Sequence, residues 1–421
     1  MSEIAVLRNK VGQESQVLHP AMGRVLFLLG LSVVINYIDR SNLSIAAPLI
    51  KDEMGITASQ LGMLLSAFFW TYSLMQIVSG WLVDRFDVKW VFALGFVLWS
   101  AATAVTGLLH GFLALLAVRV VLGIGEAVSF PSYGKVICGY FDEKRRGFAN
   151  AVVISGVALG PAIGMLIGGG VVSRFGWRPF FIAVGLAGVL WVLPWFAWMP
   201  RRDAASAATP SPVSGMIAVI RRGQAWAMWL IHFALAYPLY FLLTWLPYYL
   251  TRSRGLSLNQ MARAGGLIFL IFAGASALTG KLADRWIAAG ATPTRVRKSL
   301  AVAGSMGVAI FMAATPIVHN TTLCIEMLVL VGISMGMLGT NVYSTAQTLA
   351  GPRMVGRWTG LQQCMGNLSG AVAPAVTGLL LDRTGHFSGP FFLAAIISVI
   401  GAIIWLLLGR IQTIDWGSDL A

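Results

Sequence analysis

Twelve separate apolar stretches, each about 20 residues or longer, constrain this chain more than any other feature. Such a stretch can cross a bilayer as a helix, because a helix satisfies every backbone polar group internally. Of the 421 residues, 57% are hydrophobic and 11% are charged, whereas soluble domains carry about 25% charged residues. We therefore expect an all-α membrane protein with twelve transmembrane helices. The stretches are Val25–Ala47, Leu61–Val83, Trp90–Leu109, Phe112–Val136, Phe148–Val172, Pro179–Met199, Ala225–Leu250, Ala262–Leu282, Ser299–Val318, Leu323–Leu349, Thr359–Leu381 and Pro390–Gly409.

One long polar interruption divides these stretches into six and six. It contains AASAATPSPVSG, whose small polar residues and two prolines are typical of a flexible connector. The two halves also repeat each other, since GWLVDR at Gly80–Arg85 recurs as GKLADR at Gly280–Arg285, and GGVVSRFGWRPFF at Gly169–Phe181 resembles GLLLDRTGHFSGPFF at Gly378–Phe392. Internal repeats with a site at their interface are a transporter signature. We predict two pseudo-symmetric six-helix bundles, residues 1–199 and 224–421, joined by a cytoplasmic linker at 200–223.

The net charge of +14 follows the predicted topology. Most of the 30 Lys and Arg residues fall on the side that holds both termini, which the positive-inside rule places in the cytoplasm. The excess of positive charge therefore indicates the topology of the chain. On the cytoplasmic face it would contact membrane lipid, and a nucleic-acid partner is not expected. Because Val25–Ala47 is long enough to span, we expect a retained first helix and not a cleaved signal peptide.

Motifs for enzymatic or metal chemistry are missing from the sequence. Cys138, Cys324 and Cys364 have no paired spacing, so neither a disulfide framework nor a cysteine metal site is expected. GIGEAV lacks the Lys-Ser/Thr of a phosphate loop, and no HExxH or GxSxG occurs. An intramembrane enzyme is therefore disfavoured, and we expect no metal and no cofactor.

Charged residues inside the predicted spans carry the most functional information. Asp39 and Arg40 lie in the first span, and Arg119 and Glu126 lie in the fourth. Each costs at least about 2.5–3.5 kcal/mol at the bilayer centre unless it is paired or hydrated. Arg119 and Glu126 are two helical turns apart and share one face. Two interpretations remain: a set of buried structural salt bridges, or a water-filled path with anion-binding arginines and protonatable carboxylates.

These residues lie in motifs that resemble a known family. GWLVDRFDVKW after the second span resembles the loop of the major facilitator superfamily, although Asp87 stands where that family usually has glycine. NYIDRSNLSIA, SAFFWTYSLMQIVSGWLVDRF and the R-x6-E of the fourth span resemble the anion:cation symporter family within it, which includes bacterial importers of sugar acids and hexuronates. The likeness covers essentially the whole chain.

The resemblance assigns roles to individual residues. It implies that Asp39 and Glu126 are proton-linked carboxylates, that Arg119 is coupled to Glu126, and that Tyr37, Arg40 and Tyr72 lie near the substrate. The loop motif and its repeat imply gating residues, which are Asp84, Arg85, Asp284 and Arg285.

The second half offers uncharged polar groups for the rest of the substrate. His232 falls where sugar-acid importers of this family tend to have glutamine. Other candidates are Thr340, Asn341, Tyr343, Gln363 and Asn367. Each of these side chains could equally form a hydrogen bond between packed helices. Val157 departs from the polar side chain that sugar-acid relatives often have at this position.

We therefore expect a proton-coupled symporter that imports a small organic anion, such as an aldonate, aldarate or hexuronate, by alternating access. It would be driven by the proton gradient and act as a monomer in the bacterial inner membrane. The alternatives are efflux, Na⁺ coupling, transport of aromatic or other carboxylates, and a non-transporting receptor of the same fold.

Overall fold

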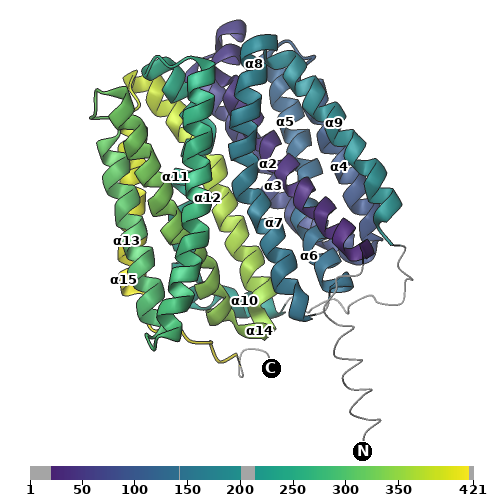
Figure 1. The fold of residues 1–421 in the computed structure, drawn as a ribbon, viewed down its shortest axis with the longest axis vertical. Helices are drawn as coiled ribbons and strands as arrows, with labels where there is room; N and C mark the ends of the chain where they lie inside the picture. The colour runs from purple at the N-terminus through teal and green to yellow at the C-terminus, as the bar shows by residue number, and fades with distance from the viewer. Residues whose placement is uncertain (1–19, 142, 201–213, 417–421) are drawn as a thin grey trace, which may run out of the picture.

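The computed structural model describes residues 20–141, 143–200 and 214–416. Within these ranges the regular structure is entirely helical, and twelve helices are long and apolar enough to cross a membrane, as the sequence predicted. In Figure 1 the first half, purple to teal, lies beside the second half, green to yellow. The first half contains α2 Pro20–Met54, α3 Ala58–Arg85, α4 Val88–Thr106, α5 Phe112–Glu126, α6 Ser129–Tyr140, α7 Glu143–Ile163, η1 Gly164–Gly168, α8 Gly169–Phe175 and α9 Trp177–Trp198.

The second half begins with a short helix inside the predicted linker. This helix is α10 Ser214–Ile220, while residues 201–213 lie outside the described part of the chain. The division at 200–223 itself stays a prediction. The remaining elements are α11 Gly223–Tyr248, η2 Tyr249–Ser253, α12 Leu258–Ala288, α13 Pro293–Ala314, α14 Thr321–Thr384 and α15 Ser388–Leu407.

Three of the predicted spans contain a local irregularity of the backbone. The fourth span, Phe112–Ile137, has its helical hydrogen bonding interrupted between Glu126 and Ser129, because Pro131 has no N–H to donate to the carbonyl of Ala127. The element α14 consists of two spanning helices that meet at Gly351, whose φ of +63° and ψ of 173° are not helical. Glycine adopts this backbone conformation without strain. The two spans of α14 are Thr321–Gly351 and Arg357–Thr384.

The repeated motifs occupy matching structural positions. Lys89 donates to the carbonyls of Phe196 and Met199 at the end of α9, at 3.0 and 2.7 Å. Lys298, at the corresponding place in the second half, donates to the carbonyls of Leu406 and Leu408 at the end of α15. A cation at a helix C-terminus satisfies free carbonyls and interacts favourably with the helix dipole. These two contacts support the pseudo-symmetry that the sequence repeats predicted.

The predicted gating residues lie at the ends of α3 and α12. Arg85, Asp284 and Arg285 are exposed there, and the side chain of Asp84 is outside the described residues. Asp87, the departure from the family pattern, is the N-cap of α4 and accepts the amide of Lys89 at 2.9 Å. The aspartate thus replaces the glycine turn with a capped helix start. The gating role of these residues stays a prediction.

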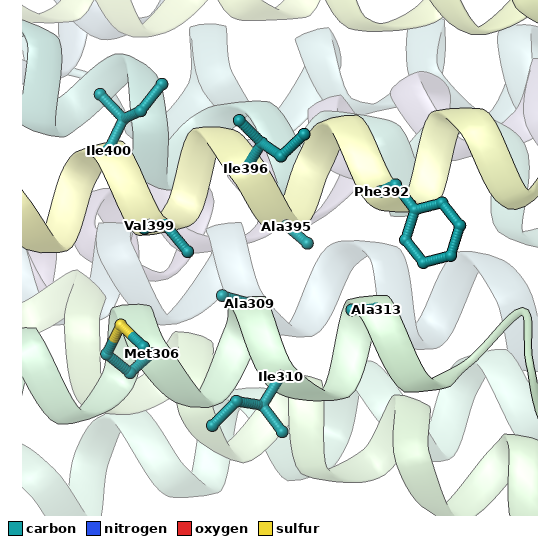
Figure 2. Close-up of a pocket in the computed structure, with 9 residues that line it drawn as sticks. All are labelled: Met306, Ala309, Ile310, Ala313, Phe392, Ala395, Ile396, Val399 and Ile400. Carbon is teal, nitrogen blue, oxygen red and sulfur yellow. The ribbon is translucent and has the colours of Figure 1, made fainter.

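A surface groove of about 510 Å³ lies between α13 and α15 (Figure 2). Its lining is wholly apolar, from side chains such as Met306, Ile310, Phe392 and Ile400. An apolar groove offers no partner for a charged solute, because an ion that leaves water needs a compensating charge or hydrogen bond. A site for a charged ligand must therefore lie elsewhere, and the buried charges of the first half are the candidates.

Candidate substrate site

The centre of the site is a buried ion pair between α2 and α5. Arg40 Nε donates to Glu126 Oε2 at 3.1 Å, and both side chains are at most 2% exposed. The sequence placed Glu126 on one face with Arg119, whereas its hydrogen bond in the structure is with Arg40. Arg119 is still close enough to act on Glu126 electrostatically. The placement of α2 and α5 in the helix bundle therefore decided which arginine the carboxylate contacts.

Three aromatic rings surround the Arg40 guanidinium. Its central carbon lies 4.4 Å from the ring centre of Tyr72, 4.7 Å from Tyr37 and 4.9 Å from Phe68. Such cation–π contacts contribute about 2 kcal/mol or more each when they are shielded from water. The rings stabilise a charge whose carboxylate partner among the described residues is Glu126, and they hold the planar guanidinium in a fixed orientation. Tyr37 and Tyr72, both predicted near the substrate, are thus brought to Arg40.

Several buried polar atoms of this cluster have no hydrogen-bond partner among the described residues. They are Arg40 Nη2, Glu126 Oε1, Arg119 Nε and Nη1, and both amide atoms of Asn36. Buried polar atoms are normally paired, so an unpaired set in one place indicates hydrogen-bonding groups that water or a ligand would satisfy. The free donors here belong to two arginines. The cluster can therefore receive an anion.

Asp39 lies next to Arg40 in sequence but faces a different set of groups. It is 2% exposed and accepts a hydrogen bond from Asn42 at 3.1 Å. Arg119 and Glu126 both act on it electrostatically. The four predicted charges thus form one cluster of two arginines and two carboxylates within the first half.

The second half contacts this cluster through α11 and α14. Tyr240 donates to Asn367 Oδ1 at 3.1 Å, and Asn367 Nδ2 lies 3.4 Å from Gln76 Oε1 on α3. The ring of Tyr240 also meets that of Phe69 edge to face, at 4.6 Å between centres. Asn367 therefore joins the two halves beside Tyr72.

A second polar group lies around His232. Tyr343 OH is 3.4 Å from His232 Nε2 and 3.4 Å from Gln363 Oε1, and His232 Nδ1 has no partner among the described residues. Gly366 makes room for the imidazole, since a Cβ there would lie 2.8 Å from His232 Cε1. The structure thus brings together three of the predicted second-half residues.

One predicted residue whose side chain is described, Asn341, joins neither group. Asn341 is buried and donates to the carbonyl of Met337 in its own helix at 2.8 Å, which is a local contact. The side chain of Thr340 lies outside the described residues.

Sequence reasoning missed Phe68, Gln76 and Tyr240. Gln76 follows Tyr72 by four residues, and Tyr240 follows His232 by eight, so helical spacing would have placed each on the face of a predicted neighbour. Phe68 carried no polar signal, because its contribution is the face of its ring.

Twelve spanning helices around a buried arginine–carboxylate cluster define a polytopic membrane transporter, not an enzyme, and the comparisons with known proteins agree. The chain belongs to the Major Facilitator Superfamily, whose profile matches residues 29–374. A crystal structure of a bacterial homologue of the human lysosomal transporter Spinster, in an inward-facing and occupied conformation, has the same fold. Its TM-score is 0.80 at 20% identity, over 94% of this chain and 98% of that one.

Relatives that match nearly the whole chain narrow the choice of transporter group within this superfamily. The chain is 31% identical over 414 residues to the probable sulfoacetate transporter of Cupriavidus necator, covering 93% of this chain and 94% of that one. It is 29% identical over 392 residues to the hexuronate transporter of Bacillus subtilis, covering 90% and 92%. It is 28% identical over 435 residues to the probable L-galactonate transporter of Escherichia coli, covering 97% and 94%. The predicted resemblance to the anion:cation symporter group is confirmed by these relatives.

Proposed function

We propose that this chain is a proton-coupled symporter that imports a small organic anion by alternating access. The observation that carries the proposal is the position of Arg40, whose one carboxylate partner is Glu126 and whose Nη2 has no partner among the described residues. A substrate carboxylate would bind the free edge of the guanidinium, where charge-assisted hydrogen bonds are strong and directional. The aromatic rings around Arg40 fix the plane in which that anion must lie.

Coupling to protons follows from competition for Arg40. When Glu126 is ionised, it and the anion are rival partners of one guanidinium. When Glu126 is protonated, Arg40 is free to bind the anion fully. Proton binding and anion binding then favour each other, and linkage makes the effect equal in both directions. Asp39, beside Arg119, is the second carboxylate assigned to this role.

The substrate class follows from charge and from the relatives. Two buried arginines leave up to two positive charges when both carboxylates are protonated, which suits a mono- or dianion. The similar transporters are named for sulfoacetate, hexuronate and L-galactonate, all small organic anions. His232, Tyr343, Gln363 and Asn367 would bind hydroxyl groups of a sugar acid such as an aldonate, aldarate or hexuronate. Val157 is partly buried, and because its side chain is apolar it would form no hydrogen bond with the substrate.

The proposed setting is the bacterial inner membrane, with both termini cytoplasmic and the chain acting as a monomer. Lys and Arg are enriched on the face that holds Pro20 and the last described residues. The positive-inside rule makes this face cytoplasmic. Substrate would then enter from the opposite face and leave at the basic one.

Uptake into proteoliposomes tests the proposal. Labelled sulfoacetate, galactonate, glucarate and glucuronate are offered with an inward proton gradient, with a Na⁺ gradient, or with neither. Accumulation driven by the proton gradient is expected for at least one of these anions. Accumulation that needs Na⁺, or export alone, would replace the proton-import mechanism, and absence of any anion transport would reject the substrate class.

A further inference from the structure

The two halves are joined by a group of contacts on the face opposite Pro20 and Trp416. We call this the far face; α8 marks it at the top of Figure 1. There Arg252 forms an ion pair with Asp52, and Ser173 Oγ donates to Asn259 Oδ1 at 3.1 Å. The third contact, made by Asp382 at the end of α14, has a different chemistry.

Asp382 caps a helix that belongs to the other half. Its Oδ1 accepts the amide of Ala58 at 2.9 Å and its Oδ2 accepts the amide of Ser59 at 2.7 Å. These are the first two amides of α3, and such amides have no partner inside their own helix. The next one, of Gln60, is bound by the Thr57 hydroxyl at 3.2 Å. The first turn of α3 is therefore capped jointly by its own half and by the opposite half.

Close backbone packing holds Asp382 at this position. A Cβ on Gly378, one turn before Asp382, would collide with the carbonyl of Ala58. A Cβ on Gly62 would lie 2.6 Å from the carbonyl of Pro374. Glycine at both places lets α3 and α14 touch along their backbones. The carboxylate consequently reaches the helix end directly.

The pseudo-symmetric counterpart of this contact, which also lies on the far face, is weaker. Residues Gly55–Gln60 and Gly255–Gln260 match in sequence and form the same capping box, and Ser173 occupies the place of Asp382 in the repeated motif. Ser173 bonds the side chain of Asn259, where Asp382 bonds backbone amides. A carboxylate at a helix N-terminus gains from the helix dipole, which a neutral hydroxyl does not. The far face is thus held by two pseudo-symmetric contacts of unequal strength.

We propose that Asp382 is a positioning residue for transport, acting as the latch that holds the far face closed by capping α3. The cap joins the two halves, so it must break whenever they separate at this face. A cap supplied by α3's own half would instead persist in every state. This inference rests on the alternating access proposed above and assigns Asp382 to one step of that cycle.

Distances between spin labels on the far face test the latch. His110 and His319 are exposed there, one in each half, and are replaced by labelled cysteines after the three native cysteines are removed. Asp382→Ala is expected to raise the ratio of separated to closed far faces roughly fivefold, the effect of losing one good N-cap. Asp382→Glu should keep most of the closed population. Arg383→Ala, the neighbouring exposed charge, is the matched control and should leave the distances unchanged.

The measurement needs neither substrate nor gradient, so its failure is distinct from failure of the proposed symport. A distance distribution in Asp382→Ala equal to that of the parent would overturn the latch. So would an equal shift in Arg383→Ala. If Asp382→Ala does not fold, Asp382→Leu, whose side chain also has no acceptor, is read by the same criteria. Ser173→Ala should shift the distance distribution less than Asp382→Ala does. A larger shift in Ser173→Ala would contradict the assignment of the latch to Asp382.

Discussion

Replacing Glu126 by glutamine tests the competition for Arg40 directly. Glutamine keeps the shape and one oxygen that can accept from Arg40 Nε, which lies 3.1 Å from Glu126 Oε2. Removing a partner outright from a buried pair costs about 3–5 kcal/mol. Here the guanidinium stays charged and a neutral amide oxygen replaces the carboxylate, so the bond moves from the upper towards the lower end of the range of about 1.5–3 kcal/mol for hydrogen bonds to charged groups. We therefore expect the variant to fold with a loss of about 1 kcal/mol.

The expected functional effect is a loss of pH dependence. If one proton must bind Glu126 for each anion bound, the apparent Kd of the parent protein rises up to tenfold per pH unit as that proton is lost. Glu126→Gln resembles the protonated state at every pH, so its Kd should stay flat and low. It should still exchange internal for external substrate, and it should fail to accumulate substrate from a pH gradient.

Titration of purified protein with the transported anion, over about two pH units around neutrality, measures both slopes. Glu53→Gln is the control, because Glu53 is a far-face carboxylate bound to Arg178 at 2.8 Å. It should keep the slope of the parent. A tenfold slope that persists in Glu126→Gln, or full accumulation from a pH gradient, would refute the coupling role of Glu126 and leave Asp39 or Na⁺ to drive transport.

Substitutions at three further positions test the side chains around the site. Arg40→Ala should weaken anion binding by at least about 1.5 kcal/mol, more than tenfold, and Arg40→Lys should recover part of it because an ammonium lacks the planar fork; uptake near that of the parent by Arg40→Ala would remove Arg40 from the site. His232→Gln should preserve or broaden sugar-acid uptake while His232→Leu depresses it, and equal uptake by the two would favour a packing role. Gly366→Ala should displace the His232 ring and cost about 1–3 kcal/mol in thermal unfolding, whereas Gly360→Ala, with open space around it, should cost little. An equal loss of thermal stability in the two variants would contradict the conclusion that Gly366 makes room for the His232 ring.

Much of the fold was readable from the sequence, because hydrophobic length is a local property. A stretch of about 20 apolar residues has few stable alternatives to a spanning helix, so the twelve predicted spans match the structure. Local details of the backbone were not readable in the same way. The interruption after Glu126 and the non-helical junction at Gly351 depend on how Pro131 and a positive-φ glycine are accommodated by neighbouring helices.

The candidate site was likewise predictable from the sequence only in part. A charge inside a spanning helix is costly wherever it points, so Asp39, Arg40, Arg119 and Glu126 stood out without any structure. Which charges pair is set by the packing of different helices. Helical spacing put Arg119 and Glu126 on one face, yet Glu126 bonds Arg40, a residue 86 positions away.

Contacts between the halves depended most on tertiary structure. Asn367 reaches Gln76 across 291 positions, and Asp382 reaches Ala58 across 324. The repeats show that the ends of α8 and α14 correspond, but they do not show which helix each end meets. That choice is made by glycines that let α3 and α14 approach, since a single Cβ at Gly62 or Gly378 would separate them. Sequence thus determined the spans and their buried charges, and three-dimensional packing decided which partners those charges and helix ends contact.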